Sequence, residues 1–331
     1  MLRSYTKYLR KIGFVGWLCL INSMANAQQD AQYSQYMFNG LYVNPAYAGY
    51  RDATYAQAFY RSQWTGIKGA PESLSFSFDT YIEDKKIGLG VILSKDKIGA
   101  QSMLNGYLTF AYRLRLSEDP NNTLSFGLGA GILQTGLDGS LLEPGELNDI
   151  RIPTALERKT APDLRAGLQF TMANFFVGLS VNNLFSHQAN QITNAPVYLT
   201  AKSHYYLTSA AIFPLQDGLK LKPSFLIKDD WHGPASLDLN TFFIFKDAFS
   251  IGATYRTSIQ IFPRKTLEEG LTKRSAIGLL MDFLVQKRFR IGYAFDYSLN
   301  QLANYEHGSH EISLGYYFSP PKERSRLFYC F

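Results

Sequence analysis

The sequence feature that most constrains the fold is the stretch LNGYLTFAYRLRL at residues 104–116, in which apolar and polar side chains alternate. Because successive side chains of a β-strand point to opposite faces, this strand would have one apolar face and one face of amide, hydroxyl and guanidinium groups. Its length exceeds the roughly 10 residues that a tilted strand needs to cross a bilayer. A half-buried strand of a soluble β-sandwich has the same pattern, so the remainder of the chain must decide between the two.

The N-terminus has the features of an export signal, which we assign to residues 1–27. Basic residues precede an apolar run at residues 12–21, and Ala25 and Ala27 supply a small-x-small cleavage site. The apolar run is too short to span a membrane. We therefore expect the signal to be cleaved and the mature chain to start at Gln28.

The composition favours an exported membrane barrel. The signal holds four basic residues, so the mature chain has 29 Lys and Arg against 27 Asp and Glu, and nothing in that balance calls for nucleic acid. Cys330 is the one cysteine left, so no internal disulfide is expected. Aromatic residues make up 15% of the chain and charged residues 18%. No later segment reaches the roughly 18 apolar residues of a membrane helix, which favours strands as the crossing elements and the outer membrane as the location.

The alternating pattern recurs along the chain and predicts an all-β fold, a transmembrane antiparallel up-and-down β-barrel of about 14 strands over residues 51–318. The strands are expected at residues 54–61, 73–80, 87–93, 104–116, 124–132, 164–172, 175–182, 204–213, 219–228, 236–245, 249–258, 276–285, 289–298 and 309–318. Short turns and longer loops alternate between them, as expected if the short turns face the periplasm. An even strand count puts both ends of the chain on that side, with residues 319–331 as a periplasmic tail.

The polar faces show no catalytic or cofactor-binding pattern, so we predict a non-enzymatic protein without metal or cofactor. His307 and His310 lie at a loop-to-strand junction without cysteines. Ser309 and His310 are adjacent on a strand and point to opposite faces, so they cannot act as nucleophile and base. Glycines of the inner parity at residues 127–131 are expected to keep room in the lumen. Several inward charges are expected to neutralise one another across neighbouring strands. They are Asp79, Arg113, Arg115, Asp238, Asp282, Arg290, Asp296 and Glu311.

Residues 28–50 fit the strand pattern badly and are either a periplasmic lead or a plug in the lumen. Within them, Tyr33-Ser34-Gln35-Tyr36-Met37-Phe38-Asn39 runs into Tyr42-Val43-Asn44-Pro45-Ala46-Tyr47-Ala48-Gly49. This motif resembles the opening signature of the PorP/SprF family of type IX secretion system membrane proteins. The resemblance implies an outer-membrane protein needed for secretion or surface anchoring of a large cargo protein, often a gliding adhesin. It also implies contacts with the periplasmic ring and the peptidoglycan-linked components of the apparatus.

Two long outward loops, at residues 135–163 and 183–203, are candidate partner-binding sites, because structureless loops of that length are usually functional. They carry apolar residues that a solvated loop does not need. These residues are Leu141, Leu142, Leu147, Ile150, Ile152, Val197 and Tyr198. The alternative is that the loops fold inward and cap the barrel. For the whole protein, the alternative function is an outer-membrane channel for small or hydrophobic solutes, since a 14-stranded barrel with an N-terminal segment in its lumen resembles a fatty-acid transporter.

Overall fold

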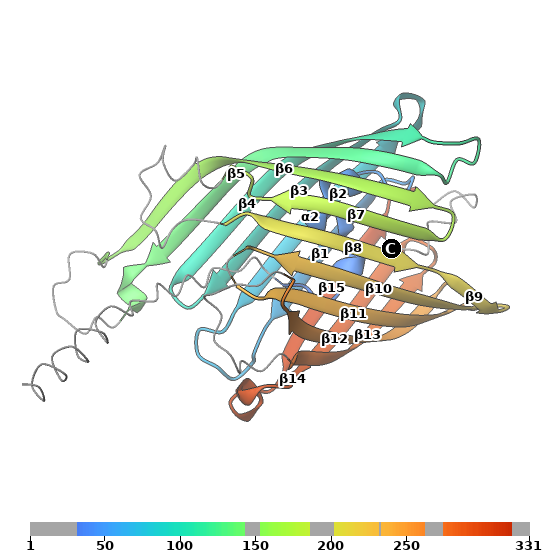
Figure 1. Cartoon of the computed structure of the whole chain (residues 1–331). Coiled ribbons are helices and arrows are strands. Elements are labelled where there is room, and N and C mark those ends of the chain that lie inside the picture. Colours follow the sequence, from blue (N-terminus) through green and yellow to red (C-terminus); the bar gives the residue numbers. More distant parts are fainter. Residues whose placement is uncertain (1–31, 143–152, 186–201, 232, 262–273, 320–331) are drawn as a thin grey trace, which may run out of the picture.

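A computed structural model describes residues 32–142, 153–185, 202–231, 233–261 and 274–319, which form a closed barrel of antiparallel strands (Figure 1). The strands are β1 (Tyr55–Ser62), β2 (Glu72–Ile82), β3 (Ile87–Ile98), β4 (Gln101–Arg115), β5 (Thr123–Asp138), β6 (Leu156–Met172), β7 (Phe175–Asn182), β8 (His204–Ala211), β9 (Phe213–Gln216), β10 (Leu219–Asp229), β11 (Ala235–Phe245), β12 (Phe249–Ile259), β13 (Arg274–Val285), β14 (Phe289–Ser298) and β15 (Ser309–Tyr317). Pairing of β1 with β15 closes the barrel. Both β8 and β9 pair with β10 and form one broken strand, which confirms the predicted 14 strands.

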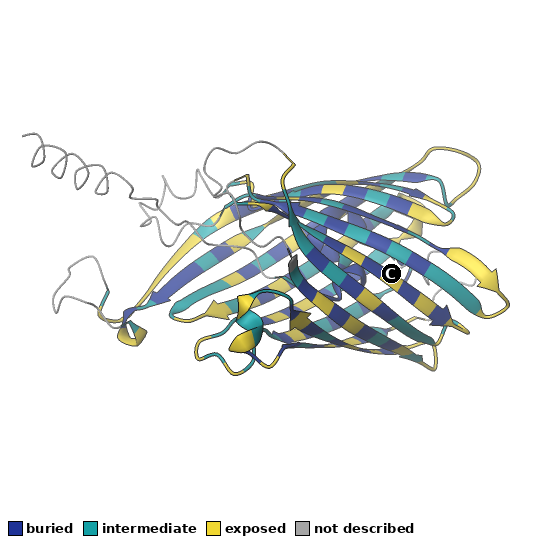
Figure 2. Cartoon of the chain, turned by 60° about the horizontal axis from the view of Figure 1, so that its bottom comes forward, coloured by how far each residue is buried: buried dark blue, intermediate teal, exposed yellow. Residues whose placement is uncertain are grey.

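Burial alternates along the strands, as the bands in Figure 2 show. In β4, Leu108 is 70% exposed on the outer face, whereas the next residue, Thr109, is 4% exposed on the inner face. This confirms the face assignment predicted for residues 104–116, and the outer face has the apolar side chains that contact with lipid requires. Among the described residues, no helix has the length and apolar content needed to span a membrane.

A charged side chain at mid-strand on the outer face is expected to destabilise the barrel strongly. Replacing Leu108 with Arg is expected to destabilise the inserted barrel by about 2–4 kcal/mol, because the guanidinium would face lipid. Leu108→Phe is the matched control, since it keeps an apolar side chain at the same place. The difference is measured as the temperature at which the migration of each variant in gel electrophoresis changes from the folded to the unfolded position. Equal behaviour of the two variants would contradict the assignment of this face to lipid.

The two ends of the barrel differ in their connections. Short turns lie at the end where the described chain enters β1 and leaves β15, as predicted, for example at residues 173–174 and 217–218. The expectation that every opposite connection is long is wrong for β3 and β4, which are joined by Gly99 and Ala100 alone. Gly99 adopts a φ of 55°, which suits such a tight turn. The charged residues before it, which suggested a loop, continue β3.

The predicted loop at residues 135–163 is also shorter than expected. Strand β5 continues to Asp138 and β6 begins at Leu156, and the two pair along this whole length. These strands carry the wall outward beyond the end of β7, as the long green arrows in Figure 1 show. The polar side chains at the ends of these strands are suited to a part of the wall outside the membrane. A search for alternating apolar residues does not detect such strand ends.

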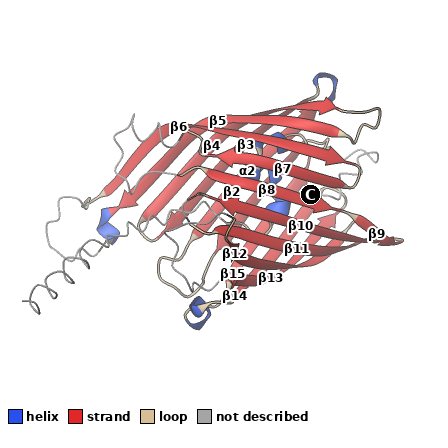
Figure 3. Ribbon diagram, viewed as in Figure 1, coloured by secondary structure: helices blue, strands red, loops and turns tan. Residues whose placement is uncertain are grey.

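Short helical turns lie inside the barrel before β1 (Figure 3). They are η1 (Tyr36–Phe38), α2 (Gly40–Val43) and η2 (Pro45–Tyr47). Other short turns are η3 (Glu83–Lys85), η4 (Gly139–Leu141) and η6 (Gln301–Asn304), which lie between strands. The inner turns and their surroundings make up the main hydrophobic core.

Candidate functional site

Residues 32–50, which we call the lumen segment, fill the inside of the barrel. Every residue from Tyr33 to Tyr50 except Gly40 is buried. Asn44 starts η2 by accepting a hydrogen bond from the Ala46 backbone N–H with its side chain, and Pro45 occupies the first helical position, where its missing N–H costs nothing. The segment therefore turns repeatedly and leaves many backbone groups to be satisfied by the barrel wall.

The outer half of the lumen segment is held by carboxylates of the wall. The backbone N–H groups of Ser34 and Gln35 donate to the two oxygens of Glu311 at 2.7 and 2.9 Å. The Ser34 hydroxyl donates to Asp296. Both carboxylates also bind Arg61, at 3.1 Å from Glu311 and 2.7 Å from Asp296. Because all three charged side chains are at most 3% exposed, this cluster lies in a setting of low dielectric where a missing partner is costly.

A second arginine extends this cluster along the wall. Arg256 donates from Nε and Nη2 to Asp238, both at 2.9 Å, and lies 3.7 Å from Asp296. It also donates to the Ser34 hydroxyl at 3.4 Å. The cluster is thus shared by β1, β11, β12, β14 and β15, and the lumen segment is bound to strands that are distant in sequence.

The middle of the lumen segment contacts the wall through amides and aromatic rings. The Asn240 amide donates to the Tyr36 hydroxyl at 2.7 Å, and the Asn39 amide donates to Ser75 at 3.2 Å. The Phe38 ring lies 3.7 Å from the guanidinium carbon of Arg290, a cation–π contact.

The half of the lumen segment next to β1 is held through its backbone carbonyls and by buried charges. Arg165 donates to the Tyr42 carbonyl, and the Ser180 hydroxyl donates to the Val43 carbonyl at 2.7 Å. At the end of the segment, the Gly49 N–H donates to Asp79 at 3.0 Å. The carboxylate of Asp79 also lies 3.5 Å from Arg51. The segment is therefore fixed at both ends and along its length.

Several inward glycines make space for the lumen segment. A Cβ at Gly127 would lie 2.0 Å from the Ala46 nitrogen, and one at Gly88 would lie 1.9 Å from the Ala48 carbonyl oxygen. A Cβ at Gly167 would lie 2.0 Å from Oδ1 of Asn44. Glycine on the inner parity does provide room, as expected, but that room is occupied by the chain itself.

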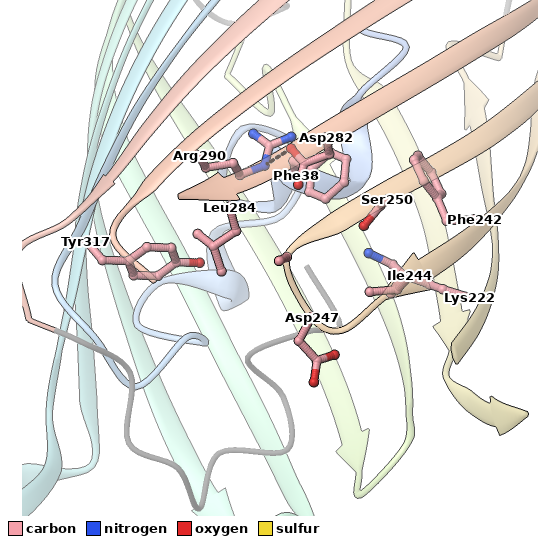
Figure 4. Close-up of a pocket in the computed structure, with 11 residues that line it drawn as sticks. Phe38, Lys222, Phe242, Ile244, Asp247, Ser250, Asp282, Leu284, Arg290 and Tyr317 are labelled. Carbon is pink, nitrogen blue, oxygen red and sulfur yellow. Dashed lines mark ion pairs between the residues drawn. The ribbon is translucent and has the colours of Figure 1, made fainter. Parts of the chain in front are cut away.

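Three cavities lined by the lumen segment and the wall, among the described residues, are small. They have volumes of about 50, 20 and 20 Å³. The first is lined by Phe38, Lys222, Phe242, Asp282 and Arg290 among others, and Arg290 and Asp282 form an ion pair in its lining (Figure 4). A water molecule needs roughly 10–15 Å³ of such space, so these cavities hold at most a few waters.

The inward charges predicted from the sequence are largely paired. Asp79, Asp238, Asp282, Arg290, Asp296 and Glu311 are buried in ion pairs, Arg113 pairs with Asp52, and Arg115 lies exposed at the end of β4. Arg61, Arg165 and Arg256 also bind the lumen segment, which was not predicted, although their inward parity is a signal that the sequence carries.

The structure separates the other candidate residues. Ser309 is buried and accepts from the Trp64 N–H, while His310 lies on the outer side against the Tyr293 hydroxyl. Among the described residues there is no group of three metal-ligating side chains. The signature residues Tyr33, Ser34, Gln35, Tyr36, Met37, Asn44, Pro45, Ala46 and Gly49 all lie in the lumen segment and are buried.

The loop candidates are only partly described. Leu141 is 57% exposed at the outer end and Leu142 is half-buried. Leu147, Ile150, Ile152, Val197 and Tyr198 lie outside the described residues, as do the cleavage-site residues Ala25 and Ala27.

Comparisons with solved structures agree with the fold. The P. putida toluene transporter TodX has 11% sequence identity, a TM-score of 0.51, and a match covering 85% of this chain and 94% of that chain. The Ralstonia pickettii toluene transporter TbuX has 8% identity, a TM-score of 0.50, and a match covering 84% and 92%. At such low identity these likenesses show the fold alone. No curated protein sequence matches the chain.

The family comparison confirms the resemblance carried by the signature in the lumen segment. The model of the type IX secretion system membrane protein PorP/SprF matches residues 25–316, which is most of the chain. The chain therefore belongs to the PorP/SprF family of type IX secretion system membrane proteins and is an outer-membrane β-barrel.

Proposed function

We propose that the protein serves type IX secretion by binding other proteins, without enzymatic activity or a cofactor. In this proposal its outer end holds a large exported protein, such as a gliding adhesin, for secretion or surface anchoring. Its periplasmic side contacts the ring and the peptidoglycan-linked components of the apparatus. The proposal includes export by a signal at residues 1–27 that is cleaved after Ala27, and a periplasmic tail after residue 318.

The observation that carries this proposal is the filled lumen. The lumen segment is bound to the wall by Arg61, Glu311, Asp296 and further polar groups, and the cavities around it are the size of a few waters. A conduit would need a continuous path, whereas a rigid barrel with a closed lumen is suited to presenting its two ends to partners. We therefore propose that residues 28–50 act as a permanent plug.

We place the exported partner on the outward loops. Leu141 is an apolar side chain left exposed at the tip of the β5–β6 projection, and Leu142 follows it. With Leu147, Ile150 and Ile152 in the same loop, and Val197 and Tyr198 in the loop between β7 and β8, they supply the apolar anchors that protein interfaces use at their centre.

The proposal is tested by replacing residues 141–152 with a Gly-Ser linker. The variant is expected to insert as a normal, heat-modifiable barrel but to lose the large exported protein that copurifies with the tagged wild type from native membranes. The matched control replaces residues 117–121, a turn at the opposite end, with a linker of the same composition. Normal copurification with the outer linker, or absence of any exported protein with the wild type, contradicts the proposal.

A channel for small hydrophobic solutes is the second candidate, and the fold likeness to the toluene transporters TodX and TbuX favours it. The two functions differ in a simple property. A binding protein with a permanent plug is expected to show no single-channel conductance in a planar bilayer and no uptake of toluene by vesicles that contain it. Steady conductance or toluene uptake by the wild type would favour the channel.

A further inference from the structure

Within the described residues, the outer part of β6 has an edge that no strand pairs with. Strand β7 pairs with β6 only from Ala166 to Met172, and one more bond joins the Leu184 N–H to the Leu164 carbonyl at 3.0 Å. Strand β5 pairs with β6 on its other side as far as Leu156. Among the described residues, no strand covers residues 156–162 of β6 on the β7 side. This edge is about 20 Å long, given a rise of about 3.3 Å per residue.

The backbone groups on that edge can be assigned from their neighbours. In an antiparallel strand, the N–H and C=O of one residue point to the same side, and every second residue points the same way. Because the Leu164 carbonyl points toward β7, the backbone groups of Leu156, Arg158 and Thr160 point there as well. Pro162 has the same parity, and a proline without an N–H is tolerated where that position faces away from a paired strand. The edge thus offers N–H donors at three residues and carbonyl acceptors at four.

The side chains show that this part of β6 lies outside both lipid and lumen. Residues 156–160 are exposed on both faces of the strand. From Asp163 onward in the sequence, buried and more exposed side chains alternate along β6. Glu157, Arg158 and Lys159 place charges along the edge, which is how proteins keep an open strand edge from aggregating. In the part of the chain that the structure describes, the edge is therefore open to another chain, and its charges disfavour flat apolar strands.

We propose that residues 156–162 of β6 bind an extended strand of the exported protein partner by adding it to the sheet next to β6. The main-chain bonds provide the affinity, and the alternating charges at residues 157–159 favour a partner strand with charges of both signs. The edge lies at the end of the barrel opposite the one where the described chain enters β1 and leaves β15. This inference rests on the proposed function and specifies where, and in which conformation, the exported partner is held.

The test removes edge donors without changing the rest of the strand. The double variant Arg158→Pro, Thr160→Pro removes two N–H groups that point to the unpaired edge. Both positions have the same parity as the natural Pro162. The matched control, Arg158→Ala with Thr160→Ala, removes the same side chains but keeps both N–H groups. Surface display is measured for the exported protein whose level at the cell surface falls when this chain is deleted. Heat-modifiability confirms that each variant inserts.

The expected result is a loss of display of at least about tenfold with the proline pair and less than about twofold with the alanine pair, since each backbone bond contributes several-fold to binding. Normal display with both pairs, while deletion of the chain abolishes display, overturns the edge as the binding site and leaves the proposed function standing. If deletion changes no surface protein, the proposed function itself fails.

Hydrogen exchange of the purified protein tests the competing occupant, which is a segment of this chain. If the edge is open for a partner, the amide hydrogens of Arg158 and Thr160 exchange as fast as those of the exposed turn at residues 117–121. Slow exchange in the purified barrel would mean that the chain covers its own edge, and the proposed strand addition would be wrong.

Discussion

Replacing Gly127 with alanine is expected to displace the lumen segment and give the barrel a measurable ion conductance. The new methyl group would lie 2.0 Å from the Ala46 nitrogen and 2.3 Å from the Pro45 carbonyl carbon. Both are backbone atoms, so no side chain can rotate away. The wall strand is held by ladders on both sides, at β4 and β6, whereas the lumen segment is held by side-chain contacts. The lumen segment should therefore move, with single-channel recording in planar bilayers as the measurement.

The matched control for this variant is Gly129→Ala. Gly129 lies on the same strand and the same inward face, but a Cβ there would meet its nearest neighbour, Cβ of Arg165, at 3.4 Å, which is ordinary contact. This variant is expected to remain closed. If Gly127→Ala is as closed as Gly129→Ala, the lumen segment does not depend on the space at Gly127. Conductance of both variants would mean that the barrel opens through general loss of stability.

Replacing Arg61 with alanine is expected to lower the free energy of unfolding by about 3–5 kcal/mol, because breaking a buried ion pair from one side leaves its partner uncompensated. Arg61 is 2% exposed and binds Asp296 at 2.7 Å and Glu311 at 3.1 Å, two carboxylates that are themselves 3% and 0% exposed. The negative charges would also lose the group that holds them close to Ser34. Urea unfolding in detergent micelles or lipid vesicles measures the change.

A partly exposed ion pair provides the comparison for Arg61. Lys220 lies 2.7 Å from Asp247 at the end of the barrel with the short turns, where the side chains are 26% and 29% exposed. Lys220→Ala is expected to cost at most about 1 kcal/mol, since solvent screens such a pair. Losses of similar size in the two variants would contradict a structural role for the buried cluster around Arg61.

The strands and their faces could be predicted from the sequence because they depend on a local pattern. The alternation of Leu108 and Phe110 with Thr109 repeats every second residue, and it assigns both the strand and the two faces. The family signature at residues 33–49 was equally visible. The location of that segment could not be predicted, because it has no periodicity that distinguishes a periplasmic lead from a segment in the lumen.

The parts that escaped prediction depend on contacts between distant residues. The extension of β5 and β6 beyond the end of β7 depends on pairing such as Thr135 with Lys159, and polar side chains there resemble those of a loop. Arg61 and Glu311 are separated by 250 residues, so nothing local shows that they meet at Ser34. From the sequence, glycine on the inner face indicates space in the lumen, but only the folded chain shows what fills that space.

The anchorage of Gln35 on Glu311 has a consequence for the order of assembly. These residues are 276 positions apart, and Glu311 belongs to the last strand, which also closes the barrel on β1. The backbone N–H groups of Ser34 and Gln35 therefore gain their acceptors only when the final strand of the chain is in place. Contacts of such long sequence separation are slow to form, because the entropy of closing the loop must be overcome first. We therefore expect closure of the seam between β1 and β15 and binding of the Ser34 and Gln35 N–H groups to Glu311 to be completed together.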